Sequence, residues 1–171
     1  MSLFDRFKSK SNVPEGYAEV KVEFTQEESE AVATSLEQYA AIANADAPEG
    51  TTMYVHPKVK EGMKAKALAE YVEDLMARLP LCGSDQEAAS LMRKAIHAQA
   101  AAYALHNLPV YLFQLAGMFD FSGDPDKAKD FFRNFLRANA EFKPDQIDTI
   151  FLNQSGFDMH EMVEVAKAKI R

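Results

Sequence analysis

The sequence predicts an all-α domain built from antiparallel helical hairpins, with about seven helices in all. Three observations predict this fold. Apolar residues recur at helical spacing in successive segments, glycines and prolines fall between those segments, and several segments begin with residues that cap helices. At 171 residues the chain is long enough for one domain with a substantial core.

The first part of the chain has a different pattern. Residues 1–17 are expected to form a flexible tail, and residues 18–171 a single helical domain. Residues 18–24 alternate between apolar and charged side chains, which predicts a short β-strand. That strand either pairs with residues 52–55 in a small ribbon or packs as an extended segment on the helices.

Caps and breaks mark the first three helices. Thr25 and Glu28 have the spacing of a capping box, so a helix begins there, with an apolar stripe that continues to Ala43. The second helix opens at Pro57 and ends before Pro80. Ser84 is expected to cap the third helix, whose many alanines allow neighbouring backbones to approach closely.

The second half of the chain shows four more helices. Residues 109–121 are apolar on nearly every side, which places this helix at the centre of the core. Asp124 caps the fifth helix. The sixth is expected to begin at Pro144 and to stop at Gly156, where a left-handed residue ends it, and Asp158 begins the seventh.

One hairpin, residues 109–142, resembles a tetratricopeptide repeat. Large, small and aromatic residues occupy the places typical of that family, with a glycine in the turn: Leu112, Leu115, Ala116, Phe119, Gly123, Ala128 and Phe132. Phe135 departs from the pattern, because the family usually has a small residue there, and the expected proline is displaced to Pro144. The resemblance covers about a fifth of the chain and implies a right-handed superhelix with a groove for a protein or peptide, without any chemistry.

Composition and the absence of known motifs exclude several classes of function. A net charge of -7 disfavours a nucleic-acid partner, which requires clustered Lys and Arg. The sequence contains no phosphate-binding loop, no nucleophile elbow and no helical metal-binding pattern, so we expect no catalytic residue, no metal ligand and no cofactor.

Location is predicted from apolar segments and cysteines. No apolar run reaches the ~20 residues that span a bilayer, and Cys82 is the only cysteine. We therefore expect a cytoplasmic protein without stable membrane insertion. Leu3 and Phe7 could lie on one amphipathic face that contacts a membrane or a partner, although a frayed terminus is the favoured interpretation.

The candidate partner-binding residues are Lys60, Lys64, Tyr103 and His106. Four lysines against one glutamate between residues 58 and 66 lie where the helix dipole disfavours positive charge. Lys60 and Lys64 share a face and could bind an acidic peptide or a phosphate. Alternatively, these lysines pair with the acidic first helix or are simply solvated.

The main functional hypothesis is a non-enzymatic interaction module or scaffold of tetratricopeptide type, with a groove lined by the third to fifth helices. The alternative is an all-α protein that binds a small molecule, or an enzyme of unrecognised class, in which Tyr103, His97 or His106 faces a pocket. A structural homo-oligomer is a third possibility, because the sequence leaves the oligomeric state open.

Overall fold

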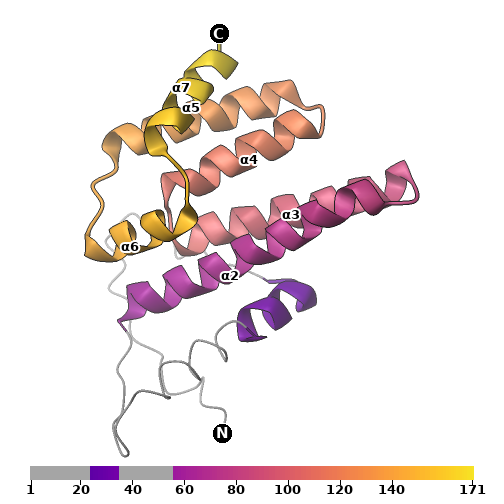
Figure 1. Cartoon of the computed structure of the whole chain (residues 1–171), viewed down its shortest axis with the longest axis horizontal. Helices are drawn as coiled ribbons and strands as arrows, with labels where there is room; N and C mark the ends of the chain where they lie inside the picture. Colours follow the sequence, from indigo (N-terminus) through magenta and orange to yellow (C-terminus); the bar gives the residue numbers. More distant parts are fainter. Residues whose placement is uncertain (1–23, 35–55) are drawn as a thin grey trace, which may run out of the picture.

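The computed structural model describes residues 24–34 and 56–171, and within these ranges every regular element is a helix (Figure 1). Residues 26–34 form a first helix. The others are α2 (Pro57–Arg78), the short 3-10 helix η2 (Leu79–Leu81), α3 (Asp85–Leu105), α4 (Pro109–Phe121), α5 (Pro125–Glu141), α6 (Gln146–Ser155) and α7 (Met159–Lys169). The all-α prediction is confirmed for this part of the chain. The predicted tail and strand, their ribbon partner at 52–55 and most of the first apolar stripe lie outside the described residues.

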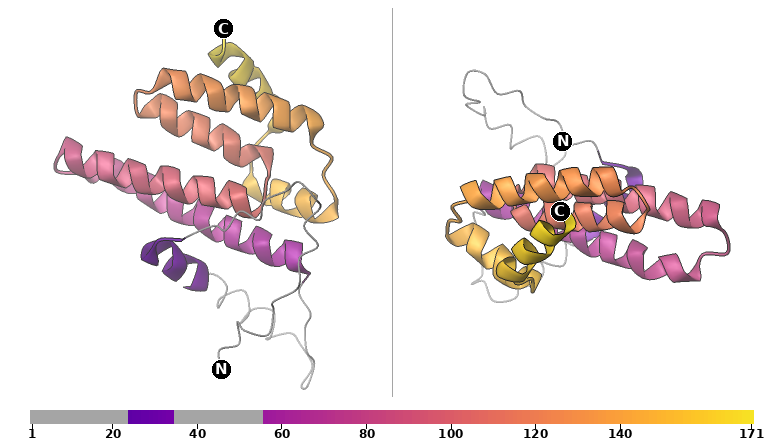
Figure 2. Two further views of the ribbon diagram at one scale, coloured as in Figure 1. Left: turned by 180° about the vertical axis from the view of Figure 1, so that it is seen from behind. Right: turned by 90° about the horizontal axis from the view of Figure 1, so that it is seen from above.

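The helices pack mainly as sequential neighbours. α2 and α3 lie along one another and are joined at one end through η2; α4 and α5 lie along one another next to them (Figure 1). α3 contacts α4, so the two pairs share one core. The helix at 26–34 lies on the side of the α2–α3 pair that faces away from α4, as Figure 1 and the left view of Figure 2 show.

Local sequence explains most helix boundaries. The Ser84 hydroxyl accepts a hydrogen bond from the Glu87 N–H at the start of α3, and the Asp124 side chain caps α5, where Pro125 occupies the first turn. Gly123 and Gly156 both have positive φ, at 80° and 70°, in the turns that follow α4 and α6. Glycine tolerates this conformation without strain, so the prediction that Gly156 ends the sixth helix is confirmed.

The start of the sixth helix was predicted incorrectly. α6 begins at Gln146 rather than at Pro144, and Asp145 is its cap. Asp145 and Asp148 form a capping box, in which each side chain accepts a hydrogen bond from the other residue's backbone N–H. Asp148 makes here the contact that a glutamate or glutamine usually makes three residues after the cap, which is why this capping box was not predicted from the sequence.

The core lies where α3 and α4 meet the outer helices. Ala95, Ala98 and Ala102 of α3 are fully buried, which lets α3 approach its neighbours closely, as its sequence predicted. α4 supplies more of the large buried apolar side chains than any other described helix, although Phe121 at its end is 71% exposed. The expectation that α4 is covered on nearly every side therefore fails at its last residue.

One helical glycine serves close packing. Gly62 lies within α2, and a Cβ atom there would lie only 2.4 Å from the ring of Phe151 in α6. The missing side chain lets the aromatic ring sit directly on the α2 backbone. This contact places α6 beside the first half of α2.

In the part of the chain that the structure describes, no helix combines the length and apolar character needed to cross a bilayer.

Candidate functional site

The strongest candidate site is an open groove formed by α3, α4 and α5, with a volume of about 440 Å³. The residues that line it are Ala100, Tyr103, Leu112, Leu115, Phe131, Asn134, Arg137, Ala138 and Glu141. Leu112 and Leu115 of α4 are almost fully buried and form the floor. Aromatic and polar side chains from α3 and α5 form the walls, so the groove offers apolar surface with a few polar groups at its edge.

Helical spacing explains the construction of this groove. Ala100 and Tyr103 are three apart in α3, and Leu112 and Leu115 are three apart in α4, so each pair shares a face. α5 contributes one face over more than two turns, from Phe131 to Glu141. We call this site the α3–α5 groove.

Tyr103, a residue predicted from sequence, lies in the α3–α5 groove. Its ring is half-buried. Burial raises the pKa of the Tyr103 phenol above its ordinary value. The hydroxyl therefore stays protonated at neutral pH and can donate a hydrogen bond to a ligand.

Lys60 and Lys64 do not reach the α3–α5 groove. Both are half-buried residues of α2. The Lys64 Nζ pairs with the Glu61 carboxylate at 2.8 Å, one turn earlier in the same helix. The four-lysine cluster is thus largely paired within the domain, because Lys58 pairs with α6 and Lys66 with Glu70. These partners lie in α2 and at the start of α6, whereas residues 35–43 of the predicted first helix lie outside the described residues.

His106 is buried, with 3% of its surface exposed, at the end of α3. Its Nε2 lies 2.8 Å from a carboxylate oxygen of Asp148. An ionised carboxylate only accepts, so Nε2 donates this hydrogen bond. A ring at this depth offers no surface to a partner, and His106 is not among the residues that line the α3–α5 groove.

The contacts of Asp148 extend this pair into a cluster that joins three helices. The other Asp148 oxygen accepts a hydrogen bond from Lys58 Nζ at 2.7 Å, and Lys58 also pairs with Asp145. Phe151 packs edge-on against the His106 ring, with centroids 5.1 Å apart. We call Lys58, His106, Asp145 and Asp148 the α6 cluster, because they attach α6 to α2 and α3.

Charge pairing sets the protonation states in the α6 cluster. Burial alone would raise the pKa of Asp148, but the hydrogen bonds from Lys58 and His106 outweigh it and lower this pKa below its ordinary value of 3.8. The hydrogen bond from Lys58 lowers the pKa of Asp145 to about 2. Both carboxylates are therefore ionised at neutral pH, and neither is suited to proton transfer there.

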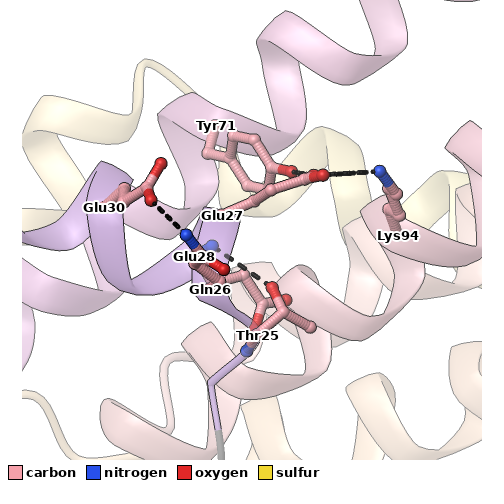
Figure 3. Close-up of a pocket in the computed structure, with 7 residues that line it drawn as sticks. All are labelled: Thr25, Gln26, Glu27, Glu28, Glu30, Tyr71 and Lys94. Atoms are coloured by element: carbon pink, nitrogen blue, oxygen red, sulfur yellow. Dashed lines mark hydrogen bonds and ion pairs between the residues drawn. The ribbon is translucent and has the colours of Figure 1, made fainter.

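A second hollow, of about 370 Å³, lies where the helix at 26–34 meets α2 and α3 (Figure 3). The Glu27 carboxylate accepts hydrogen bonds from the Tyr71 hydroxyl at 2.7 Å and from Lys94 Nζ at 2.8 Å. Burial, together with the bond to Glu27, raises the pKa of Tyr71 to about 12, and the bond from Lys94 lowers the pKa of Glu27.

The remaining polar groups of this hollow also pair with one another. Gln26 donates to Glu30, and Thr25 and Glu28 form the capping box that the sequence predicted. Glu28 is 1% exposed, and its second oxygen lies 2.8 Å from His97 Nδ1. These contacts hold the first helix in place, so we assign them to the fold and not to a ligand site.

The residues that the sequence proposed for partner binding have different surroundings in the structure. Tyr103 is in the α3–α5 groove, Lys60 and Lys64 are on α2, and His106 belongs to the α6 cluster. Sequence reasoning missed Asn134, Arg137 and Glu141, because exposed polar residues on an amphipathic helix look like any solvated face. It also missed Asp148, which is 42 residues from His106 in the chain.

Comparison of the chain with protein-family models, with curated proteins and with solved structures gives no match.

Proposed function

We propose that this protein is a non-enzymatic interaction module of tetratricopeptide-like type, which binds a segment of a partner protein in the α3–α5 groove. The observation that carries the proposal is the groove itself. It combines a buried apolar floor, two aromatic side chains and polar groups at its edge, which is the composition of a recognition surface.

Packing at the α4–α5 pair supports the family resemblance behind this proposal. Ala116 and Ala128 are buried, as small residues between close-packed helices must be. Phe113 and Phe132 meet edge-on at 5.5 Å, and Gly123 makes the turn. Phe135, the departure from the family pattern, is fully buried against Phe113, at 5.3 Å, so the pair accommodates it as core.

The shape of the groove favours a peptide segment over a small molecule. Its volume falls within the range of small-molecule sites, but it is open, and α5 borders it from Phe131 to Glu141. At a rise of about 1.5 Å per residue, these two residues lie about 15 Å apart along the helix axis. A long open groove suits an extended contact with a polypeptide better than enclosure of a compact ligand.

Photo-crosslinking tests the proposed function. We would place a photoreactive phenylalanine analogue at Ala100 or at Asn134, which are exposed residues on opposite walls of the groove. Both positions are expected to yield an adduct with the same protein in cells. Glu73, exposed on α2 and outside the groove, is the control. Absence of a shared adduct at the two groove positions, or an equal yield at Glu73, would overturn the proposal.

A further inference from the structure

We propose that the occupant of the α3–α5 groove is an amphipathic helix with an apolar stripe, flanked by an acidic residue opposite Arg137 and a basic residue opposite Glu141. This inference rests on the proposed function and adds the chemistry of the partner. Four observations carry it: the groove's length, its floor, the unpaired charges at its edge and the absence of strand edges in the described ranges.

The length of the groove sets the size of the partner. Phe131, Asn134, Ala138 and Glu141 follow one face of α5 at spacings of three and four residues. That face is about 15 Å long, which corresponds to nearly three turns of a second helix lying along it.

The apolar part of the groove suits the side chains of a helix. Leu112 and Leu115 form the floor, and Phe131 lies beside them. Ala100 and Ala138 leave space on the two walls, because neither extends beyond a methyl group. Apolar residues at positions i, i+3 or i+4, and i+7 lie on one face of a helix. On a partner helix they would enter the space between Ala100 and Ala138 one after another.

Two opposite charges lie one turn apart on the wall formed by α5. Arg137 and Glu141 are exposed and form no ion pair, with each other or with any other described residue. Their order along the helix, with the cation first, is the less favourable one for pairing within a helix. Both charges are therefore available to a partner, and a helix with an acid and a base one turn apart complements them.

The fold itself disfavours a strand as the occupant. Residues 24–34 and 56–171 contain no strand, so this surface offers no sheet edge to extend. Backbone groups within helices are already paired, so recognition must come from side chains. A helix, which also satisfies its own backbone, is the matching partner.

The test uses a displayed library of helical peptides, each about four turns long, with leucines at helical spacing. Two flanking positions one turn apart vary among Glu, Gln and Lys. A second library contains prolines, which prevent helix formation, and presents extended peptides instead. Both libraries are selected against the full chain and against the double variant R137E/E141R, with unfolding curves to verify that the variant is folded.

We expect the full chain to select helical peptides that carry one acid and one base in a single order. R137E/E141R should select the reverse order, with an exchange of preference of about tenfold. The matched control is D130R/R133E, which reverses an ion pair elsewhere on α5. That control should select the same peptides as the unmodified chain.

Three outcomes would overturn the inference. If the full chain selects extended peptides, the proposal of a helical partner is wrong, although the groove can still be the binding site. The same holds if R137E/E141R selects the same charge order as the unmodified chain. The variant Ala100→Trp obstructs the groove at an exposed residue. If the selected peptides bind this variant as tightly as they bind the unmodified chain, they bind outside the groove. If no peptide binds and the groove positions give no shared adduct in cells, the proposed function fails as well.

Discussion

Gly62 and Gly117 both lie within helices, but only Gly62 faces another helix. A Cβ at Gly62 would meet the Phe151 ring at 2.4 Å, whereas at Gly117 nothing lies within 4 Å. The same residue type therefore has opposite consequences at the two positions. At Gly62 it permits close packing of α6, and at Gly117 it only weakens the helix.

We predict that Gly62→Ala destabilises the protein by about 1–3 kcal/mol. The clash with Phe151 outweighs the gain in helix propensity of about 1 kcal/mol. Urea unfolding followed by circular dichroism measures the change. Gly117→Ala is the control and should stabilise by about 0.5–1 kcal/mol. Equal effects of the two substitutions would show that Phe151 does not lie against Gly62.

At the scale of elements, α6 is attached chiefly through the α6 cluster and Phe151. The buried Asp148 carboxylate receives hydrogen bonds from the two other helices, from Lys58 of α2 and from His106 at the end of α3. Removal of one partner of such a buried ion pair leaves the charge of the other partner buried without compensation. The docking of α6 should therefore depend on both carboxylates being ionised.

We predict that acid weakens this docking. The pKa values of Asp145 and Asp148 are lower in the folded chain than their ordinary value of 3.8. Their contribution to stability is thus fully present above pH 3.8, and for Asp145 it is lost as the pH falls toward about 2. Lys58→Met should reduce stability at neutral pH, and its difference from the unmodified chain should shrink through this window.

Urea unfolding at a series of pH values measures that difference. Lys66→Met is the control, because Lys66 pairs with the exposed Glu70 carboxylate on its own helix. A difference between Lys58→Met and the unmodified chain that stays constant from neutral pH down to pH 2 would contradict the role assigned to Lys58.

The helix at 26–34 is attached by a separate set of contacts, which centre on the buried Glu28. One Glu28 oxygen caps the helix through the Thr25 N–H, and the other lies against His97. This helix shares few of its contacts with the α6 cluster, so it should open independently.

We predict that Glu28→Ala increases amide hydrogen exchange in residues 26–34 by about tenfold, because loss of the cap and of a buried acceptor costs about 1–2 kcal/mol. Exchange in α4 and α5 should stay unchanged. Glu30→Ala, at an exposed residue that bonds only to Gln26 among the contacts described above, should have little effect. A uniform rise across all helices would instead indicate one cooperative unit.

The whole molecule carries a net charge of -7, and this charge acts on association at long range. Charge complementarity mainly changes the rate of encounter, while contacts in the groove set the rate of dissociation. The two effects can therefore be measured apart.

We predict that lysines added to the solvent-facing side of a groove-binding helix accelerate its association at low ionic strength. The dissociation rate should change little, and the acceleration should fade as salt is added. Stopped-flow measurements of association and dissociation rates test this prediction, with peptides that differ only in the residues of their solvent-facing side. An effect confined to dissociation would indicate that the added lysines make local contacts.

Local sequence was sufficient to predict most of the fold. The caps at Thr25, Ser84, Asp124 and Asp158 and the left-handed Gly156 act within a few residues of themselves, and the structure contains each of them. The start of α6 was missed, because an aspartate capping box was overlooked. Contacts between distant residues were not predictable in this way, because helical periodicity identifies an apolar face without naming the helix that covers it.

The sequence by itself determined that the described part of this chain is helical, where most of its helices begin and end, and which faces are apolar. Tertiary packing decided which polar residues meet. Asp148 reaches His106 across 42 residues, and Tyr103, Leu112 and Arg137 line one groove although each stands on a different helix. The physical reason is that caps and periodicity are short-range properties of the backbone, whereas a groove exists only after several helices have packed together.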